Sequence, residues 1–196
     1  MSERLIDDVS RELADHLTVA HEVAELLDPL RAVGRLLCDS FGAGGRLYTF
    51  GNGGSAADAQ HLVAEFVGRF RRERPPLPAV ALTVDPSVVT CIGNDYSFED
   101  IFARSVQALA RRGDVVAGFT TSGRSPNVVR GLESAQHMGA TTVLFAAGDG
   151  GDAAKYADHT LLVPSTTTAR IQEMHLLLLH LLSEIVDAWA AEERTR

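Results

Sequence analysis

A glycine-rich turn leads directly into a helix that carries a histidine and a carboxylate. The stretch reads F-G-N-G-G-S-A-A-D-A-Q-H-L-V-A-E-F over residues 50–66, so His61 and Glu65 are four residues apart. Side chains at i and i+4 project from the same face of a helix. They could move protons or share a metal ion beside a polar or anionic ligand held by the backbone N–H groups of the turn.

A second turn, rich in hydroxyl groups, follows another strand-like stretch and precedes a helix that opens at Pro126. Its hydroxyls come from Thr120, Thr121, Ser122 and Ser125. Hydroxyls and free backbone N–H groups suit the acceptor oxygens of a phosphate. The alternative for either turn alone is that Ser and Thr cap a helix and Gly makes the bend. Two such turns, each after a strand, favour a sugar-phosphate site, and the lack of lysine in both excludes a Walker A loop.

The first turn also contains a Gly51-x-Gly53 pair that resembles part of a dinucleotide-binding fingerprint. Ala56 at the third glycine position is a tolerated variant, but no acidic residue ends a second strand about 20 residues later. The prolines of residues 75–78 lie there instead. We therefore expect no nucleotide cofactor.

A long helix expected over residues 168–193 carries the remaining polar candidates, which are Arg170, Gln172, His175 and His180. Apolar residues surround most of this helix, which predicts deep burial or a place in an oligomer core. A histidine at a buried position loses hydration and needs a partner. A structural core histidine is therefore the alternative to an acid–base histidine, which would lie near a carboxylate.

The elements that position these residues alternate along the chain. Two helices are expected first, over residues 3–27 and from 28 to the glycines of 42–45. Strands are then expected at 46–50, 79–84, 115–120, 141–146 and 160–164, with helices at 55–72, 86–92, 98–111 and 127–138 and a short one before the last strand. This alternation predicts an α/β protein with a parallel sheet covered on both faces, whose ligands bind beyond the carboxyl ends of the strands. With no linker or repeat, we expect one domain over residues 1–196.

Composition limits the class of protein. The chain has 196 residues and a formal net charge of −8, which argues against nucleic acid as the main partner. The basic run of residues 69–74 is expected to form a solvated helix end, with one arginine available for chemistry. Cys38 and Cys91 lack a CxxC spacing and are expected to be buried thiols in a reducing compartment. Polar residues interrupt the apolar stretch 174–185 and no signal segment is evident, so we expect a cytoplasmic protein without a membrane span.

Four motifs in combination resemble the phosphoheptose isomerases (sedoheptulose 7-phosphate isomerases), a branch of the SIS-domain proteins. The motifs are G-N-G-G-S-A-A-D-A-Q-H, G-N-D, T-S-G-x-S and A-R-I-Q-E-M-H, and the resemblance covers nearly the whole chain. It implies a flavodoxin-like three-layer α/β/α fold with a five-stranded parallel sheet. It also implies a homotetramer with active sites at subunit boundaries, in which the helices of residues 1–42 serve oligomerisation.

The resemblance further implies a reaction and roles for individual residues. Sedoheptulose 7-phosphate would be converted to D-glycero-D-manno-heptose 7-phosphate, with Glu65 and His180 as the acid–base pair. The substrate would be bound by Asn52, Gly53, Gly54, Ser55, Glu65, Asn94, Asp95, Thr120, Thr121, Ser122, Ser125 and Gln172. A divalent ion, usually zinc and one per subunit, would be held by His61, Glu65, Gln172 and His180.

The spacing of two proposed metal ligands sets a condition on how they could bind one ion. Gln172 and His180 are eight residues apart, roughly 12 Å along a helix. They could share one ion only by leaning towards each other or by coming from different subunits. Two positions depart from the family pattern: Ala169 replaces an aspartate and removes a polar group, and Arg124 replaces an asparagine and adds a cation beside the phosphate turn.

Two related classes are alternatives to an enzyme. The replication-initiator-associating protein, a non-catalytic SIS-domain scaffold, shares the fold and the A-R-I-Q-E-M-H motif but lacks a carboxylate at position 65 and an imidazole at position 180. Because this chain has Glu65 and His180, we favour the isomerase. A sugar-phosphate-sensing SIS regulator would usually be fused to a DNA-binding module, and these 196 residues contain no such segment.

Overall fold

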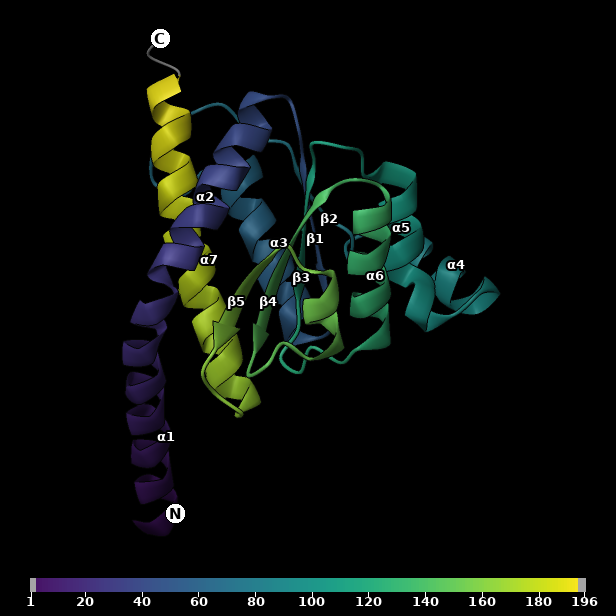
Figure 1. The fold of residues 1–196 in the computed structure, drawn as a ribbon. Coiled ribbons are helices and arrows are strands. Elements are labelled where there is room, and N and C mark those ends of the chain that lie inside the picture. Colours follow the sequence, from purple (N-terminus) through teal and green to yellow (C-terminus); the bar gives the residue numbers. More distant parts are fainter. Residues whose placement is uncertain (1–2, 194–196) are drawn as a thin grey trace.

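Five parallel strands form the central sheet of the computed structural model, which describes residues 3–193, and side chains within 8–193. Their spatial order is β2-β1-β3-β4-β5 (Figure 1). The strands are β1 (Leu47–Gly51), β2 (Ala79–Ala81), β3 (Val115–Phe119), β4 (Thr141–Ala147) and β5 (His159–Val163). Helices cover both faces, so the predicted three-layer α/β/α class is confirmed.

The α-helices divide between the two faces of the sheet. They are α1 (Glu3–Glu22), α2 (Leu27–Gly42), α3 (Gly54–Val67), α4 (Pro86–Asp95), α5 (Ile101–Leu109), α6 (Pro126–His137) and α7 (Thr168–Glu193). Successive strand residues point to opposite faces. Leu47 and Phe119 therefore join the apolar core under α2, α3 and α7, whereas Phe50 and Leu144 join the core under α5 and α6. In Figure 1, α1 projects beyond the body of the molecule.

Strand order reverses between β1 and β3. The chain runs from β1 outward to β2 and then returns to place β3 on the other side of β1. The parallel register pairs Gly51 with Phe119, the last residues of these two strands. Ligands of open parallel sheets bind in the crevice outside the strand ends at such a reversal. The two polar turns singled out in the sequence are the turns that leave β1 and β3 here.

Several predicted boundaries need correction. The first helix ends at Glu22, and a short 3₁₀ helix, η1 (Val23–Leu26), separates it from α2. Pro29 therefore lies in the first turn of α2, where its missing N–H costs no hydrogen bond. The predicted strand 79–84 ends at residue 81, and α3 ends at Val67 because Gly68 breaks the helix. Cys38 is buried as expected, but Cys91 is exposed, which contradicts the prediction.

Helix α7 lies deep in the first core. By length and composition it could cross a membrane, but half of its apolar window is buried inside the fold. Leu178 and Leu179 are completely buried against the sheet core. Packing within the subunit therefore accounts for the buried half of this apolar window.

Candidate active site

The turn after β1 places its backbone at the start of α3. Gly53 has a positive φ of 57°, a conformation that L side chains rarely adopt. At Gly54, a Cβ atom would lie 2.5 Å from Nε2 of Gln172 on α7. The positive φ favours glycine at position 53, and the missing side chain of Gly54 gives the Gln172 amide its place beside the turn. Ser55, in the first turn of α3, is buried beside them.

The turn after β3 is partly held by its own hydroxyl groups. Oγ1 of Thr120 accepts from the N–H of Gly123 at 3.2 Å, and Oγ of Ser122 accepts from the N–H of Arg124 at 3.2 Å. Ser125 precedes the first residue of α6 and makes no side-chain cap. The added cation at Arg124 is exposed and lies 3.4 Å from Asp149.

A pair of asparagines links the two turns. Nδ2 of Asn52 donates to Oδ1 of Asn127, and Nδ2 of Asn127 donates back to Oδ1 of Asn52, both at 2.8 Å. Oδ1 of Asn127 also accepts from the N–H of Val128 in α6. This pair fixes the turn after β1 relative to the helix that follows β3.

A cavity of about 80 Å³ lies between the two turns. It is lined by Asn52, Ser55, Phe119, Thr120, Thr121, Ser125 and Gln172. A neighbouring hollow of about 210 Å³ shares Thr121 and is bounded further by Ser122 and the start of α7. Ligand pockets usually measure about 300–1,000 Å³. The cavity therefore suits one polar group such as a phosphate, and the remainder of a ligand must extend outside it.

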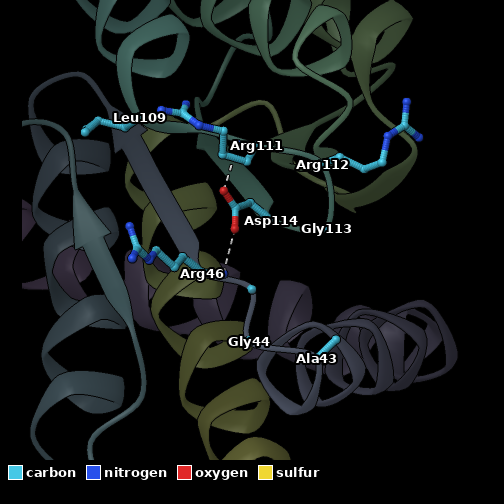
Figure 2. A pocket seen from close by; sticks show the side chains of 9 residues that line it. Ala43, Gly44, Arg46, Leu109, Arg111, Arg112, Gly113 and Asp114 are labelled. Atoms are coloured by element: carbon cyan, nitrogen blue, oxygen red, sulfur yellow. Dashed lines mark hydrogen bonds between the residues drawn. The ribbon is translucent and has the colours of Figure 1, made fainter.

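A larger hollow of about 400 Å³ lies at the opposite end of the sheet, where β1 and β3 begin (Figure 2). Asp114 sits between Arg46 and Arg111, and Arg112 points away. The carboxylate of Asp114 accepts from the backbone N–H groups of Arg46 at 2.9 Å and Arg111 at 2.8 Å. Asp114 therefore links the segments that precede β1 and β3. Ligands of open parallel sheets bind at the carboxyl ends of the strands, so this hollow is not the candidate active site.

Two histidines and a glutamate converge where α3 packs beside α7. Nε2 of His61 lies 3.0 Å from Oε1 of Glu65 and 3.3 Å from Nε2 of His180. Ligand atoms of all three residues lie within 4.8 Å of one another. The rings of His61 and His180 meet edge to face, with centroids 4.9 Å apart.

This cluster fits a zinc ion in donor type and in spacing. Zinc binds imidazole nitrogen and carboxylate oxygen at about 2.1 Å, so two ligands of a tetrahedral ion lie roughly 3.4 Å apart. The observed separations of 3.0 and 3.3 Å are close to that value. His61, Glu65 and His180 could therefore hold a metal with small adjustments of their side chains.

The electrostatic setting of the cluster favours a neutral His180. Burial lowers the pKa of His180, as do the neighbouring His61 and Arg71, against the opposite effect of Glu65. Asp58 lies on α3, one turn before His61, and burial raises its pKa to about 6. Oδ2 of Asp58 is buried and has no hydrogen-bond partner among the described residues. A neutral imidazole can bind a metal or accept a proton.

The residues predicted to form one site lie in three groups, which are the lining of the cavity, the cluster of His61, Glu65 and His180, and the end of α4. Gln172 contacts the turn at Gly54 and lines the cavity, eight residues before His180 on α7. Asn94 and Asp95 lie at the exposed end of α4, where Nδ2 of Asn94 donates to Oδ1 of Asp95 at 2.7 Å. Neither of these two lines the cavity of the same chain. The roles assigned to these residues remain predictions.

Sequence reasoning missed two residues that contact the site. Asn127, which pairs with Asn52, follows Ser-Pro at the start of a helix, a place where asparagine is common for local reasons. Phe70 stacks on the ring of His180, with centroids 5.7 Å apart and planes 22° from parallel. The position of Asn127 directly after the second polar turn is the one sequence signal that could have suggested its contact with the site. Phe70 lies among the arginines of residues 69–74, which gave no sign that it contacts a histidine.

Comparison with known proteins defines the class. Residues 13–147 match the model of the SIS-domain family. The phosphoheptose isomerase of Aquifex aeolicus is 56% identical over 149 residues, which cover 76% of this chain and 78% of that protein. That of Geotalea daltonii is 46% identical and covers 97% of this chain and 100% of its own. The chain belongs to the phosphoheptose isomerase family within the SIS-domain proteins, which confirms the resemblance found in the motifs.

A solved structure supports the same conclusion. The phosphoheptose isomerase of Neisseria gonorrhoeae superposes with a TM-score of 0.89 at 38% identity. The match covers 94% of this chain and 99% of that one. The likeness therefore extends over the N-terminal helices and α7 as well as the sheet.

Proposed function

We propose that this protein is an aldose–ketose isomerase that converts sedoheptulose 7-phosphate to D-glycero-D-manno-heptose 7-phosphate. The observation that carries the proposal is the combination of a phosphate-sized polar cavity with the cluster of His61, Glu65 and His180 on the same two helices. Relatives that cover nearly the whole chain are named phosphoheptose isomerases. A sugar phosphate is accordingly the expected substrate.

The cavity between the two polar turns would hold the phosphate of the substrate. In the proposal, the hydroxyls of Thr120, Thr121, Ser122 and Ser125 surround it together with backbone N–H groups of the turn. Asn52, Gly53, Gly54, Ser55 and Gln172 contact the sugar next to it. The cavity is too small for the whole substrate. The carbon chain would therefore extend outward, towards an acid–base pair.

The isomerisation moves one proton from C1 to C2 and a second proton from the oxygen on C1 to the oxygen on C2. Glu65 takes a proton from C1 of the open-chain ketose, which leaves an enediolate across C1 and C2, and returns a proton to C2. His180 moves a proton from the C1 hydroxyl to the oxygen on C2. C1 becomes the aldehyde and C2 carries the new hydroxyl, so atoms and electrons balance without an external oxidant.

A zinc ion is part of the proposal, one per subunit. His61, Glu65 and His180 would hold it, and Gln172 would join from the same or a neighbouring subunit. Zinc at this place would stabilise negative charge on the substrate oxygens. Glu65 has two carboxylate oxygens, so one can face the ion while the other faces the substrate.

The proposal includes an assembly. We infer a cytoplasmic homotetramer of single-domain subunits, residues 1–196, in which the helices of residues 1–42 make contacts between subunits. Asn94 and Asp95 would then reach the substrate of an adjoining subunit, because α4 carries them at an exposed end. The scaffold alternative is less favoured, since the chain retains Glu65 and His180 and its relatives are named as enzymes.

Substitution of the acid–base pair tests the roles. Glu65→Gln and His180→Gln should each lower kcat by about 100- to 10,000-fold, because a general acid or base contributes that much. Turnover is followed by NMR on sedoheptulose 7-phosphate, and circular dichroism and sedimentation check that fold and assembly persist. His137→Gln changes an exposed histidine at the end of α6 and should leave kcat unchanged. Wild-type turnover in either site variant would show that the assignment is wrong.

A further inference from the structure

The basic run that follows α3 contains a fully buried arginine. The side chains of Arg74 and Asp187 are 0% and 1% exposed, and Nε of Arg74 lies 3.1 Å from Oδ1 of Asp187. Arginine and aspartate are almost never buried to this extent unless they are paired. The reaction proposed above makes no use of either residue. The burial of Arg74 contradicts the expectation that this run forms a solvated helix end, and the helix itself ends before the run, at Val67.

Arg74 binds the backbone at the end of the helix that carries Glu65. Nη2 of Arg74 donates to the carbonyl oxygen of Glu65 at 2.6 Å, and Nη1 donates to those of Phe66 at 2.7 Å and Gly68 at 3.3 Å. The last carbonyls of a helix have no partner within the helix, and a cation there also complements the helix dipole. Arg74 therefore fixes the final turn of α3, including the backbone of Glu65.

Asp187 holds the same segment from the side of α7. Its Oδ2 accepts from the backbone N–H groups of Arg71 at 3.2 Å and Arg72 at 2.8 Å. Burial would raise the pKa of Asp187, but these N–H groups and the Arg74 guanidinium hold that pKa below its ordinary value. Asp187 lies seven residues after His180, two turns further along the same side of α7. The carboxylate thus anchors residues 71–74 to the helix that carries His180.

The anchored segment also touches His180 directly. Phe70 stacks on one face of the His180 ring, while His61 meets the ring from α3. Nη2 of Arg72 lies 2.7 Å from Oε1 of Glu184, one turn after His180. A shift of residues 70–74 would therefore change the surroundings of His180 and the backbone of Glu65 at the same time.

We propose that the buried Arg74–Asp187 pair is the positioning element that sets the distance between Glu65 and His180. The inference rests on the proposed function, since it assigns the pair to the geometry of that acid–base and metal cluster. The pair touches neither the cavity nor the ligand atoms of the cluster, so it acts only through α3 and α7. Arginine is required because a planar guanidinium reaches the carboxylate and several carbonyls together, which a lysine ammonium cannot do.

The test compares Arg74→Lys and Asp187→Asn with the wild-type protein. Zn²⁺ affinity is measured by competition with a chelator on the metal-free protein, and kcat and KM are measured on sedoheptulose 7-phosphate. We expect Zn²⁺ binding to weaken roughly 10- to 100-fold, as for other residues that orient ligands. We expect kcat to fall about 100-fold, the effect of a displacement near 1 Å. KM should change little, because the substrate-binding turn of residues 52–55 lies at the other end of α3 and the phosphate turn precedes α6.

The control is Val106→Ala, which creates a cavity in the core on the other face of the sheet, where Val106 of α5 is buried. It should lower the free energy of unfolding without changing Zn²⁺ affinity or kcat. Asp187→Asn keeps an oxygen for the N–H groups of residues 71 and 72, and it decides the matter if Arg74→Lys does not fold. Wild-type Zn²⁺ affinity and kcat in the folded variants would overturn the inference, as would equal losses in Val106→Ala.

The outcomes separate this inference from the proposed function. A wild-type protein that binds Zn²⁺ without isomerising the sugar would refute the proposed function, and the Zn²⁺ comparison would still decide the role of Arg74. A wild-type protein that isomerises while Arg74→Lys does so equally well would refute the positioning role alone. A wild-type protein with neither property would refute both, since there would be no site to position.

Discussion

The central feature at the residue scale is the contact between side chains that lie far apart in the chain. His61 and His180 are 119 residues apart and their Nε2 atoms approach to 3.3 Å. Glu65 completes the group at 3.0 Å from His61. Two imidazoles and a carboxylate at this spacing can hold one ion or exchange a proton. A related protein without groups at positions 65 and 180 could do neither in this way.

The pKa of His180 gives a prediction at this scale. Burial is the largest cause of the lowered pKa, and the Phe70 ring covers one face of the imidazole. Phe70→Ala admits water to that face, so the pKa of His180 should rise towards its ordinary value of about 6.5. An NMR titration of the metal-free protein measures it, with the signal assigned by its loss in His180→Gln. An unchanged or lower pKa in Phe70→Ala would contradict this account of the site.

The three residues of the cluster could be predicted from the sequence, but the residues that position them could not. The i, i+4 spacing and the family motifs pointed to His61 and Glu65, and the buried final helix pointed to His180. Phe70 and Arg74 belong to a run that looks like a solvated surface segment, because charge alone does not show which guanidinium finds a buried partner. Asp187 likewise carries no local signal, since its partners lie more than 100 residues earlier.

At the scale of elements, α3 and α7 determine the site together. Gly54 meets Gln172 near the beginning of both helices, His61 meets His180 further along, and residues 71–74 meet Asp187 beyond that. The helices therefore run side by side in the same direction from the carboxyl end of the sheet. One helix pair carries the substrate turn at one end and the buried Arg74–Asp187 pair at the other, with the acid–base cluster between them.

Helix α7 also contains a histidine that should make stability depend on pH. His175 is completely buried, Nε2 donates to the carbonyl of Ala146 at 3.2 Å, and burial lowers its pKa to about 4. The unfolded pKa is near 6.5, so the unfolded chain binds more protons between these values. This contribution to stability is complete above about pH 6.5 and is lost as the pH falls towards 4, by up to about 3 kcal/mol.

Replacement of His175 by a group that does not titrate tests that contribution. His175→Gln can still donate to Ala146 and should lose less stability than the wild type between about pH 7 and about pH 5. Urea unfolding at the two pH values gives the difference. Equal losses in the two proteins would mean that His175 does not titrate as its burial implies.

At the scale of the whole molecule, the fold was largely predictable from the sequence, and the homotetramer stays a prediction. The alternation of strands and helices gave the parallel sheet, and the polar turns after residues 51 and 119 marked the place where strand order reverses. Two predicted boundaries were wrong: α3 ends early at Gly68, and a short 3₁₀ helix separates α1 from α2. Helical periodicity predicted α1 but could not show that Val9, Leu13 and Leu17 face outward while Val19 packs into the core.

The exposed apolar stripe of α1 supports a prediction about assembly. Val9, Leu13 and Leu17 recur every four residues and are 70%, 59% and 53% exposed. Such a stripe on a projecting helix is typical of an interface. The double variant Leu13→Glu and Leu17→Glu should sediment as a smaller species than the wild type and lose turnover. The control Asp15→Asn, at an exposed polar position of the same helix, should change neither property. A double variant with the mass of the wild type would exclude α1 from the subunit contacts.

The most direct test of the central claim is turnover itself. The purified full chain is incubated with sedoheptulose 7-phosphate, with and without a chelator, and the sugar is followed by NMR. The account predicts that D-glycero-D-manno-heptose 7-phosphate appears, with proton exchange from solvent at C2 and slower conversion when the metal is removed. No conversion with or without the chelator, even with added Zn²⁺, would contradict the isomerase and favour the scaffold.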